Sequence, residues 1–134
     1  FVIAPYGRIK ASSDISERQV FTENIAFKMQ NLLEKVVGPN GTANDALIPG
    51  YKTFGKTGTS QKNRDAWFVG FTEHPVTTGI WVGPKENATM KGVSGGSLAA
   101  QIFKRYNKNL YERLEKCGEE FTPINEGFAR DVNC

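Results

Sequence analysis

Cysteine, histidine and long apolar runs are scarce in this 134-residue chain, and each shortage removes a class of function. Cys117 and Cys134 are too few for a disulfide scaffold and wrongly spaced for a structural zinc site. The single histidine, His74, would have to carry any Ser-His-Asp triad alone, and we expect it in a solvent-exposed turn. No stretch reaches the ~18 apolar residues that cross a bilayer, so we expect no membrane span here.

Charge of either sign is also modest and unevenly placed. Residues 1–114 carry 15 basic and 9 acidic side chains, a net +6, whereas residues 115–134 carry 2 and 5, a net −3. No run of Lys and Arg interleaved with aromatic residues marks a groove for nucleic acid, so we expect no nucleic-acid partner. We therefore expect one domain over 1–114 and an acidic tail over 115–134. The two tail cysteines leave a disulfide and two free thiols as open alternatives.

Apolar residues at three- and four-residue steps predict two amphipathic helices, over 23–37 and about 97–114. Thr22 is a suitable N-cap for the first helix. The second helix has an expected apolar face of Leu98, Ala99, Ile102, Phe103, Tyr106, Leu110 and Leu114. We expect both helices to pack on a sheet.

Segments rich in β-branched and aromatic residues predict strands near 52–60, 65–72 and 77–82. The links between them are only a few residues long, whereas a parallel crossover needs a dozen or more, so the strands pair antiparallel. Residues 1–11 add short apolar runs around a turn, which suit a hairpin. The expected fold class is α+β, with an antiparallel sheet of about three to five strands flanked by helices.

The segment Lys56-Thr57-Gly58-Thr59 carries the strongest chemical signal in the chain. Gly58 weakens a strand interior, but it lets another extended backbone lie close alongside, as a peptide adding to a sheet edge would. The Lys56 ammonium attracts a carboxylate, which a Thr57 or Thr59 hydroxyl can bind with defined direction. Alternation along a strand places Lys56 and Gly58 on one face and the two threonines on the other. The alternative is an edge strand with lysine as a guard against aggregation.

The overlapping range 50–57 also satisfies the phosphate-loop pattern G-x-x-x-x-G-K-[ST]. That loop follows a buried parallel strand and opens directly into a helix. Here Pro49 precedes the pattern, and Gly58-Thr59-Ser60 follows it and leads to another strand. The context therefore disfavours nucleotide binding.

Four motifs in order resemble class A penicillin-binding proteins, in the C-terminal part of their transpeptidase domain. The motifs are Gly55–Gln61, Asp65–Thr72, Thr78–Gly83 and Gly95–Ala100. The match covers roughly residues 1–114, and it implies a partial β-lactamase/transpeptidase-like fold. It also implies a bacterial parent protein that is anchored in the inner membrane and faces the periplasm or cell exterior.

The resemblance implies serine acyl transfer, in which the serine of a Ser-x-x-Lys motif attacks the D-Ala-D-Ala amide of a peptidoglycan stem peptide. An amine of a neighbouring strand then takes the acyl group, and β-lactam antibiotics trap the same serine. The resemblance assigns a catalytic role to Lys56 and substrate binding to Thr57, Gly58, Thr59, Ser60 and Gln61. The implied partners are stem peptides, β-lactams and the remainder of the transpeptidase domain upstream of Phe1, with no cofactor and no metal.

The chain lacks both the Ser-x-x-Lys motif and a Ser-x-Asn motif. Its serines are Ser12, Ser13, Ser16, Ser60, Ser94 and Ser97, and none has a lysine three residues on. Removing a nucleophile removes nearly all of a catalytic unit's rate, so we predict that the isolated chain is inactive. Two alternatives are a non-catalytic domain that senses cell-wall peptides or β-lactams, and a fragment of a β-lactamase.

Three other residues have structural interpretations. Trp67 and Trp81 lie at matching phase in two strands, and we expect them in the core, with contact to a stem peptide as the alternative. Asp65, at a strand start, is expected to cap a turn or to pair with Arg64 or Lys62.

Overall fold

The computed structural model describes residues 2–3, 9–11, 18–74, 76–85 and 88–117. In chain order the elements are β1 (Val2–Ile3), β2 (Ile9–Ala11), α1 (Glu23–Val37), η2 (Asn44–Ala46), β3 (Thr53–Thr59), η3 (Gln61–Asn63), β4 (Ala66–Thr72), β5 (Thr77–Val82), η4 (Gly95–Ala99) and α2 (Ala100–Cys117). The α+β prediction is confirmed, with β1 and β2 as an antiparallel hairpin and a separate three-stranded sheet. Cys134 and the acidic tail from position 118 onward lie outside the described residues.

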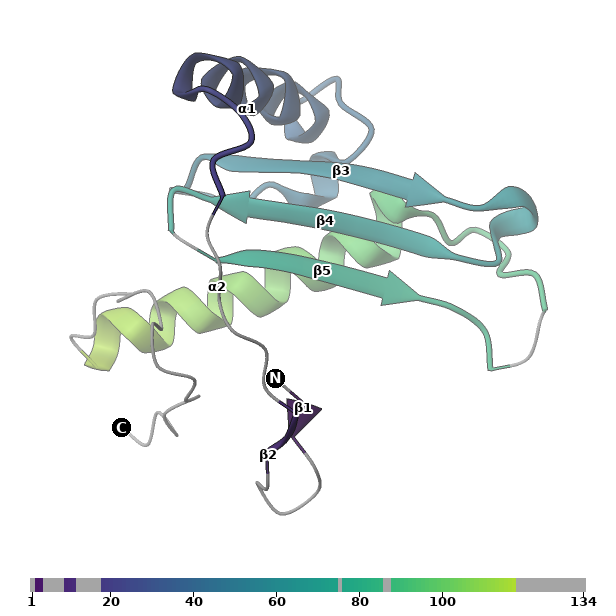
Figure 1. Ribbon diagram of the computed structural model, residues 1–134. Coiled ribbons are helices and arrows are strands. Elements are labelled where there is room, and N and C mark those ends of the chain that lie inside the picture. Colours follow the sequence, from purple (N-terminus) through teal and green to yellow (C-terminus); the bar gives the residue numbers. More distant parts are fainter. Residues whose placement is uncertain (1, 4–8, 12–17, 75, 86–87, 118–134) are drawn as a thin grey trace.

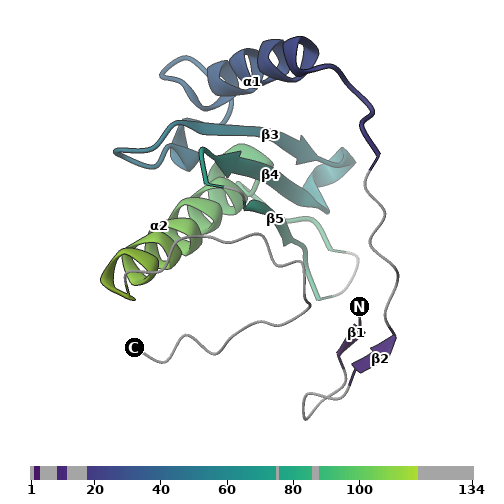
Figure 2. The ribbon, with the colours of Figure 1, turned by 60° about the vertical axis from the view of Figure 1, so that its left-hand side comes forward.

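The three-stranded sheet has the order β3-β4-β5, and both pairings are antiparallel. Helix α2 crosses one face of this sheet, whereas α1 lies beyond the β3 edge (Figure 1). Figure 2 shows the same arrangement from a second side. The short links after β3 and β4 produce this meander, because they cannot reach around a helix.

Burial alternates along β4, because α2 covers only one of its faces. Phe68 is fully buried beneath α2, whereas Trp67 and Val69 are 46% and 45% exposed. Trp81 of β5 is 53% exposed and lies 6.4 Å from Trp67 between ring centroids. The expectation that both tryptophans lie in the core is therefore wrong. Trp67, Val69 and Trp81 form the open face of the sheet.

The core lies between the sheet and α2, where Phe68 and Phe103 meet edge to face at 4.8 Å between centroids. The fully buried members of this cluster are Val37, Ala43, Ala46, Ile48, Phe68, Ala99, Ala100, Phe103 and Tyr111. The α-helix α2 begins and ends about three residues later than predicted, after the π-helical turn η4. Its buried face is also rotated from the predicted one, since Ile102 and Tyr106 are 39% and 53% exposed.

Asn107 is the polar residue at the centre of the α2 contact, and its side chain is fully buried. Its Oδ1 accepts a hydrogen bond of 3.0 Å from the Thr78 hydroxyl, and its Nδ2 donates one of 2.9 Å to the Phe103 carbonyl. The hydroxyls of Tyr111 and Thr72 are 2.8 Å apart in the same region. Hydrogen bonds thus join α2 to both β4 and β5.

Three rings gather where α2 passes the end of β4. His74 packs against Tyr111 at 4.5 Å and against Tyr51 at 5.5 Å between centroids, so it is half-buried rather than in an exposed turn. The Tyr51 hydroxyl donates a 2.6 Å hydrogen bond to Glu115, and this bond, with burial, raises the pKa of Tyr51 to about 12. Burial likewise raises the pKa of Tyr111.

Helix α1 contacts β3, but it buries little of its apolar surface. Val37, at its C-terminal end, is the α1 residue that is fully buried in the core. Ile25, Met29 and Leu32, one turn apart along the same side of the helix, are 49%, 51% and 56% exposed. These three residues form the α1 stripe. Within the described ranges, no helix is both long and apolar enough to cross a membrane.

Candidate functional site: the edge of strand β3

The register of β3 against β4 fixes which side chains of the lysine and threonine segment share a face. Lys56 and Gly58 pair with Val69 and Trp67 of the open face, whereas Thr57 pairs with the buried Phe68. Opposed residues of an antiparallel pair project to the same side. Lys56 and Gly58 therefore belong to the open face, and the threonines belong to the face of α2 and η4.

The side chains of Lys56 and Thr57 nevertheless approach each other at the outer edge of β3, which is an edge strand within the described residues. The exposed Lys56 side chain turns to that edge, where Nζ donates a 2.9 Å hydrogen bond to the Thr57 carbonyl. The same Nζ lies 3.4 Å from the Thr57 hydroxyl. A cation, a hydroxyl and an unpaired length of strand thus lie together, which suits an extended ligand with a carboxylate.

Thr59 is held from the opposite direction by the turn that precedes α2. The backbone N–H of Gly95 donates a 3.1 Å hydrogen bond to the Thr59 hydroxyl oxygen. Gly95 is buried, whereas Thr59 is exposed, so the Thr59 side chain is anchored on one side and open on the other. This bond joins residues 36 positions apart in the sequence.

Ser60 and Gln61 lie just beyond β3. The Ser60 hydroxyl accepts a 2.8 Å hydrogen bond from the Asp65 N–H, and the Ser60 N–H donates one of 2.9 Å to the Asp65 carbonyl. Ser60 therefore closes the hairpin between β3 and β4, and Gln61 is exposed at the start of η3. The Asp65 carboxylate accepts a 3.0 Å hydrogen bond from the Trp81 indole, rather than pairing with Arg64 or Lys62 as expected.

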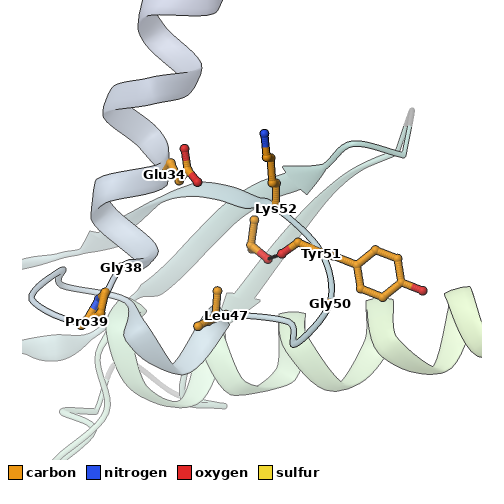
Figure 3. Close-up of a pocket in the computed structure, with 8 residues that line it drawn as sticks. Glu34, Gly38, Pro39, Leu47, Gly50, Tyr51 and Lys52 are labelled. Atoms are coloured by element: carbon orange, nitrogen blue, oxygen red, sulfur yellow. Dashed lines mark hydrogen bonds between the residues drawn. The ribbon is translucent and has the colours of Figure 1, made fainter.

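Two hollows of the structure lie away from this edge. The first, of about 430 Å³, lies between the end of α1 and the segment before β3, and Glu34, Pro39 and Lys52 line it (Figure 3). The second, of about 600 Å³, separates α1 from Phe54 and Phe71. Neither hollow is lined by residues 56–59. The candidate site at residues 56–59 thus lies outside both hollows, on the edge strand β3 of the described sheet.

Gly95 and Gly96 are the residues near the site that sequence reasoning did not assign to it. Both belong to a motif of the family resemblance, but a pair of glycines before a helix carries no signal of its contact with a distant strand. Among the described residues, His, Cys, Asp and Glu do not gather in groups of three or more that could hold a metal ion. The arrangement at β3 offers anion binding and hydrogen bonding.

The comparisons with known proteins agree on one family. Residues 2–108 match the family described as "Penicillin binding protein transpeptidase domain". Penicillin-binding protein 1B of Haemophilus influenzae is 35% identical over 112 residues, which are 81% of this chain and 14% of that protein. Penicillin-binding protein 1A of Clostridium botulinum (strain Langeland) is 27% identical over 119 residues, 86% of this chain and again 14% of the relative.

A third relative, penicillin-binding protein 1A of Aquifex aeolicus, is 41% identical over 86 residues, covering 63% of this chain and 12% of that protein. The chain belongs to the penicillin-binding protein transpeptidase domain family, and its class A resemblance is confirmed. It spans about one seventh of the length of the Clostridium botulinum and Haemophilus influenzae relatives, 14% in each case.

Proposed function

We propose that this chain is the part of a peptidoglycan D,D-transpeptidase that supplies the substrate-binding strand, and that β3 receives the D-Ala-D-Ala end of a stem peptide or a β-lactam. Residues 1–114 would be the transpeptidase part and 115–134 an acidic tail. The observation that carries the proposal is the meeting of Lys56 Nζ and the Thr57 hydroxyl, 3.4 Å apart, on an unpaired strand edge. Both ligand classes present a carboxylate and a peptide-like amide.

The roles follow from the chemistry of each group. The Lys56 ammonium favours the ligand carboxylate and remains beside the reacting centre. The hydroxyls of Thr57 and Thr59 give that carboxylate a defined direction, and Gly58 leaves room for an extended ligand on the open face. The N–H of Thr59 would contribute to an oxyanion hole, where a donor is aimed at charge that develops in the transition state. Ser60 and Gln61 would contact the ligand beyond β3.

The nucleophile has to come from other polypeptide of the parent protein. Its serine would attack the ligand carbonyl, break the bond to the departing D-Ala amine and form an ester, which the amine of a second stem peptide then cleaves. We propose that this polypeptide lies upstream of Phe1 and that the parent protein is anchored at the periplasmic or outer side of a bacterial inner membrane. The chain itself contributes binding and charge.

Titration of the chain with N-acetyl-D-alanyl-D-alanine, followed by backbone-amide NMR, tests this proposal. Lys56→Met should weaken binding about three- to tenfold, because it removes one charge-assisted hydrogen bond at an exposed site. Lys52→Met is the matched control, since Lys52 is an exposed lysine four residues earlier on the same segment. Equal binding by wild type and Lys56→Met would contradict the assignment of β3 as the carboxylate site.

A further inference from the structure

We propose that the Gly95–Gly96 turn is a positioning device for the carboxylate site, and that the Gly95 N–H directs the Thr59 hydroxyl proton toward the bound carboxylate. The inference rests on the proposed function, and it assigns to Gly95 a role that acts through Thr59. It starts from the 3.1 Å hydrogen bond between the Gly95 nitrogen and the Thr59 hydroxyl oxygen.

The direction of this bond determines what Thr59 can offer to a ligand. A hydroxyl has one proton to donate and two lone pairs that accept, whereas a backbone N–H can only donate. The Gly95 N–H therefore occupies a lone pair of the Thr59 oxygen on the buried side. The one hydroxyl proton is left for the exposed side, and a carboxylate, which carries acceptors only, is the complementary ligand.

The approach of the turn to β3 requires glycine at both positions. A Cβ on Gly95 would lie 2.2 Å from the Trp67 carbonyl oxygen and 2.6 Å from that of Gly58. A Cβ on Gly96 would lie 2.0 Å from the Thr42 carbonyl oxygen. All three obstacles are backbone atoms, which cannot rotate away as a side chain can, so the glycines are what let the Gly95 N–H reach Thr59.

The turn itself is held rigidly by its two serines. The Ser97 hydroxyl accepts a 2.9 Å hydrogen bond from the Ser94 N–H, and the Ser97 N–H donates one of 3.2 Å to the Ser94 carbonyl. The Ser94 side chain completes this reciprocal capping box at the start of η4. A capping box satisfies helix-end donors and fixes the entry of the chain, so the Gly95 N–H has a defined direction.

The same turn also bears on Thr57. A Cβ on Gly96 would lie 3.7 Å from the Thr57 Cγ2 methyl group, so that methyl faces the turn. The Thr57 hydroxyl lies instead 3.4 Å from Lys56 Nζ, at the strand edge. Thr57 thus has its methyl group against the turn and its hydroxyl at the edge, whereas Thr59 has the accepting side of its hydroxyl against the turn. A carboxylate at β3 meets hydroxyls that are already oriented.

The test measures how strongly the chain prefers a carboxylate to a neutral amide. N-acetyl-D-alanyl-D-alanine and its C-terminal amide are each titrated by NMR, and the ratio of their dissociation constants is the readout. In one variant glycolic acid replaces Gly95, which exchanges the N–H for an ester oxygen and adds no Cβ. The ratio should fall about threefold, as expected for a hydroxyl no longer oriented by one hydrogen bond. The same exchange at Gly92, an exposed turn glycine, is the control and should leave the ratio unchanged.

Thr59→Val separates this inference from the proposed function. If wild type shows no preference for the carboxylate, the proposed function fails and the inference fails with it. If Thr59→Val keeps the preference, Thr59 does not bind the carboxylate and the inference fails, while the proposed role of Lys56 and Thr57 stands. If Thr59→Val loses the preference while the Gly95 ester keeps the full ratio, only the role of Gly95 is overturned. Loss in both variants supports the inference.

Exchange of the Gly95 amide proton with solvent gives a second readout that needs no ligand. Thr59→Val removes the acceptor, so the Gly95 proton should exchange about fivefold faster, whereas Thr59→Ser keeps a hydroxyl and should retain most of the protection. Because Thr59 is exposed, both variants should fold. Equal exchange rates in the two variants would show that Thr59 does not hold the Gly95 N–H.

Discussion

At the scale of single residues, Gly95 has no room for a side chain, because backbone atoms of β3 and β4 lie where its Cβ would be. Gly95→Ala would place a methyl group 2.2 Å from the Trp67 carbonyl oxygen, so η4 would have to move away from β3 and β4. We expect the free energy of unfolding to fall by about 1–3 kcal/mol, as for other overpacked sites. Urea denaturation followed by circular dichroism measures it.

Gly79→Ala is the control for that substitution. A Cβ on Gly79 would lie 3.9 Å from a Val69 methyl group, which is ordinary van der Waals contact on the open face of the sheet. We expect a change within about 0.5 kcal/mol of wild type. A Gly95→Ala protein as stable as Gly79→Ala would mean that the turn has room to relax.

A second residue-scale prediction concerns Tyr51 and alkaline pH. Its hydrogen bond to Glu115, together with burial, raises the pKa from 10.0 to about 12, so the unfolded chain loses this proton at a lower pH than the folded chain. The resulting stabilisation is complete below pH 10 and is lost as the pH rises through about 12. Urea denaturation across this range should show a shallower loss of stability for Tyr51→Phe than for wild type.

Tyr106→Phe, at an exposed tyrosine of α2, controls for the removal of a phenol. Burial also raises the pKa of Tyr111, so some decline should remain in Tyr51→Phe. Parallel declines in wild type and Tyr51→Phe would contradict the role of the bond to Glu115.

At the scale of elements, the packing of α2 on β5 depends on one buried amide. Asn107→Ala would leave the Thr78 hydroxyl and the Phe103 carbonyl without this partner. We expect the free energy of unfolding to fall by roughly 1–3 kcal/mol, because buried polar groups that lose a partner keep their desolvation cost. Asn109→Ala, at an exposed position two residues further on, should change it by less than about 0.5 kcal/mol. Equal free energies of unfolding for the two variants would contradict the role of the Asn107 amide in holding α2 on β5.

The same elements show how far the sequence predicts the fold. The three strands and two helices follow from local signals, namely β-branched residues, short links and helical periodicity. The buried face of α2 does not follow, because Asn107 is polar and counts against burial in any hydrophobic pattern, whereas its partner Thr78 comes from another element. The expected burial of Trp67 and Trp81 is wrong for a related reason, since hydrophobicity cannot indicate which face of a sheet a helix covers.

The residues of the candidate site also differ in whether the sequence predicts them. Lys56 and Thr57 were identified from four consecutive residues, since their chemistry is visible in the motif itself. The contribution of Gly95 was not predictable, because it consists of a backbone N–H and an absent side chain that meet Thr59 only in three dimensions. Sequence reasoning thus finds the groups that we propose to bind the ligand, and the structure adds the group that we propose to orient Thr59.

At the scale of the whole molecule, two features support the proposal that other polypeptide completes the site. The α1 stripe exposes about half of each of its three apolar side chains, and the sequence holds no Ser-x-x-Lys nucleophile. We therefore expect that a fluorescent penicillin will not label the isolated chain covalently. Denaturing gel electrophoresis measures the label, with an intact transpeptidase domain of the same family as the positive control. Stoichiometric labelling at any serine of this chain would contradict the prediction.

The open face of the sheet has a practical consequence for such experiments. Trp67 and Trp81 are the two tryptophans of the chain, both are about half exposed, and Trp67 is the register partner of Gly58. Indole emission should therefore be red-shifted and accessible to quenching by iodide. Any ligand or polypeptide that covers this face would shift the emission to the blue and shield it, so intrinsic fluorescence reports occupancy beside β3 without an added dye.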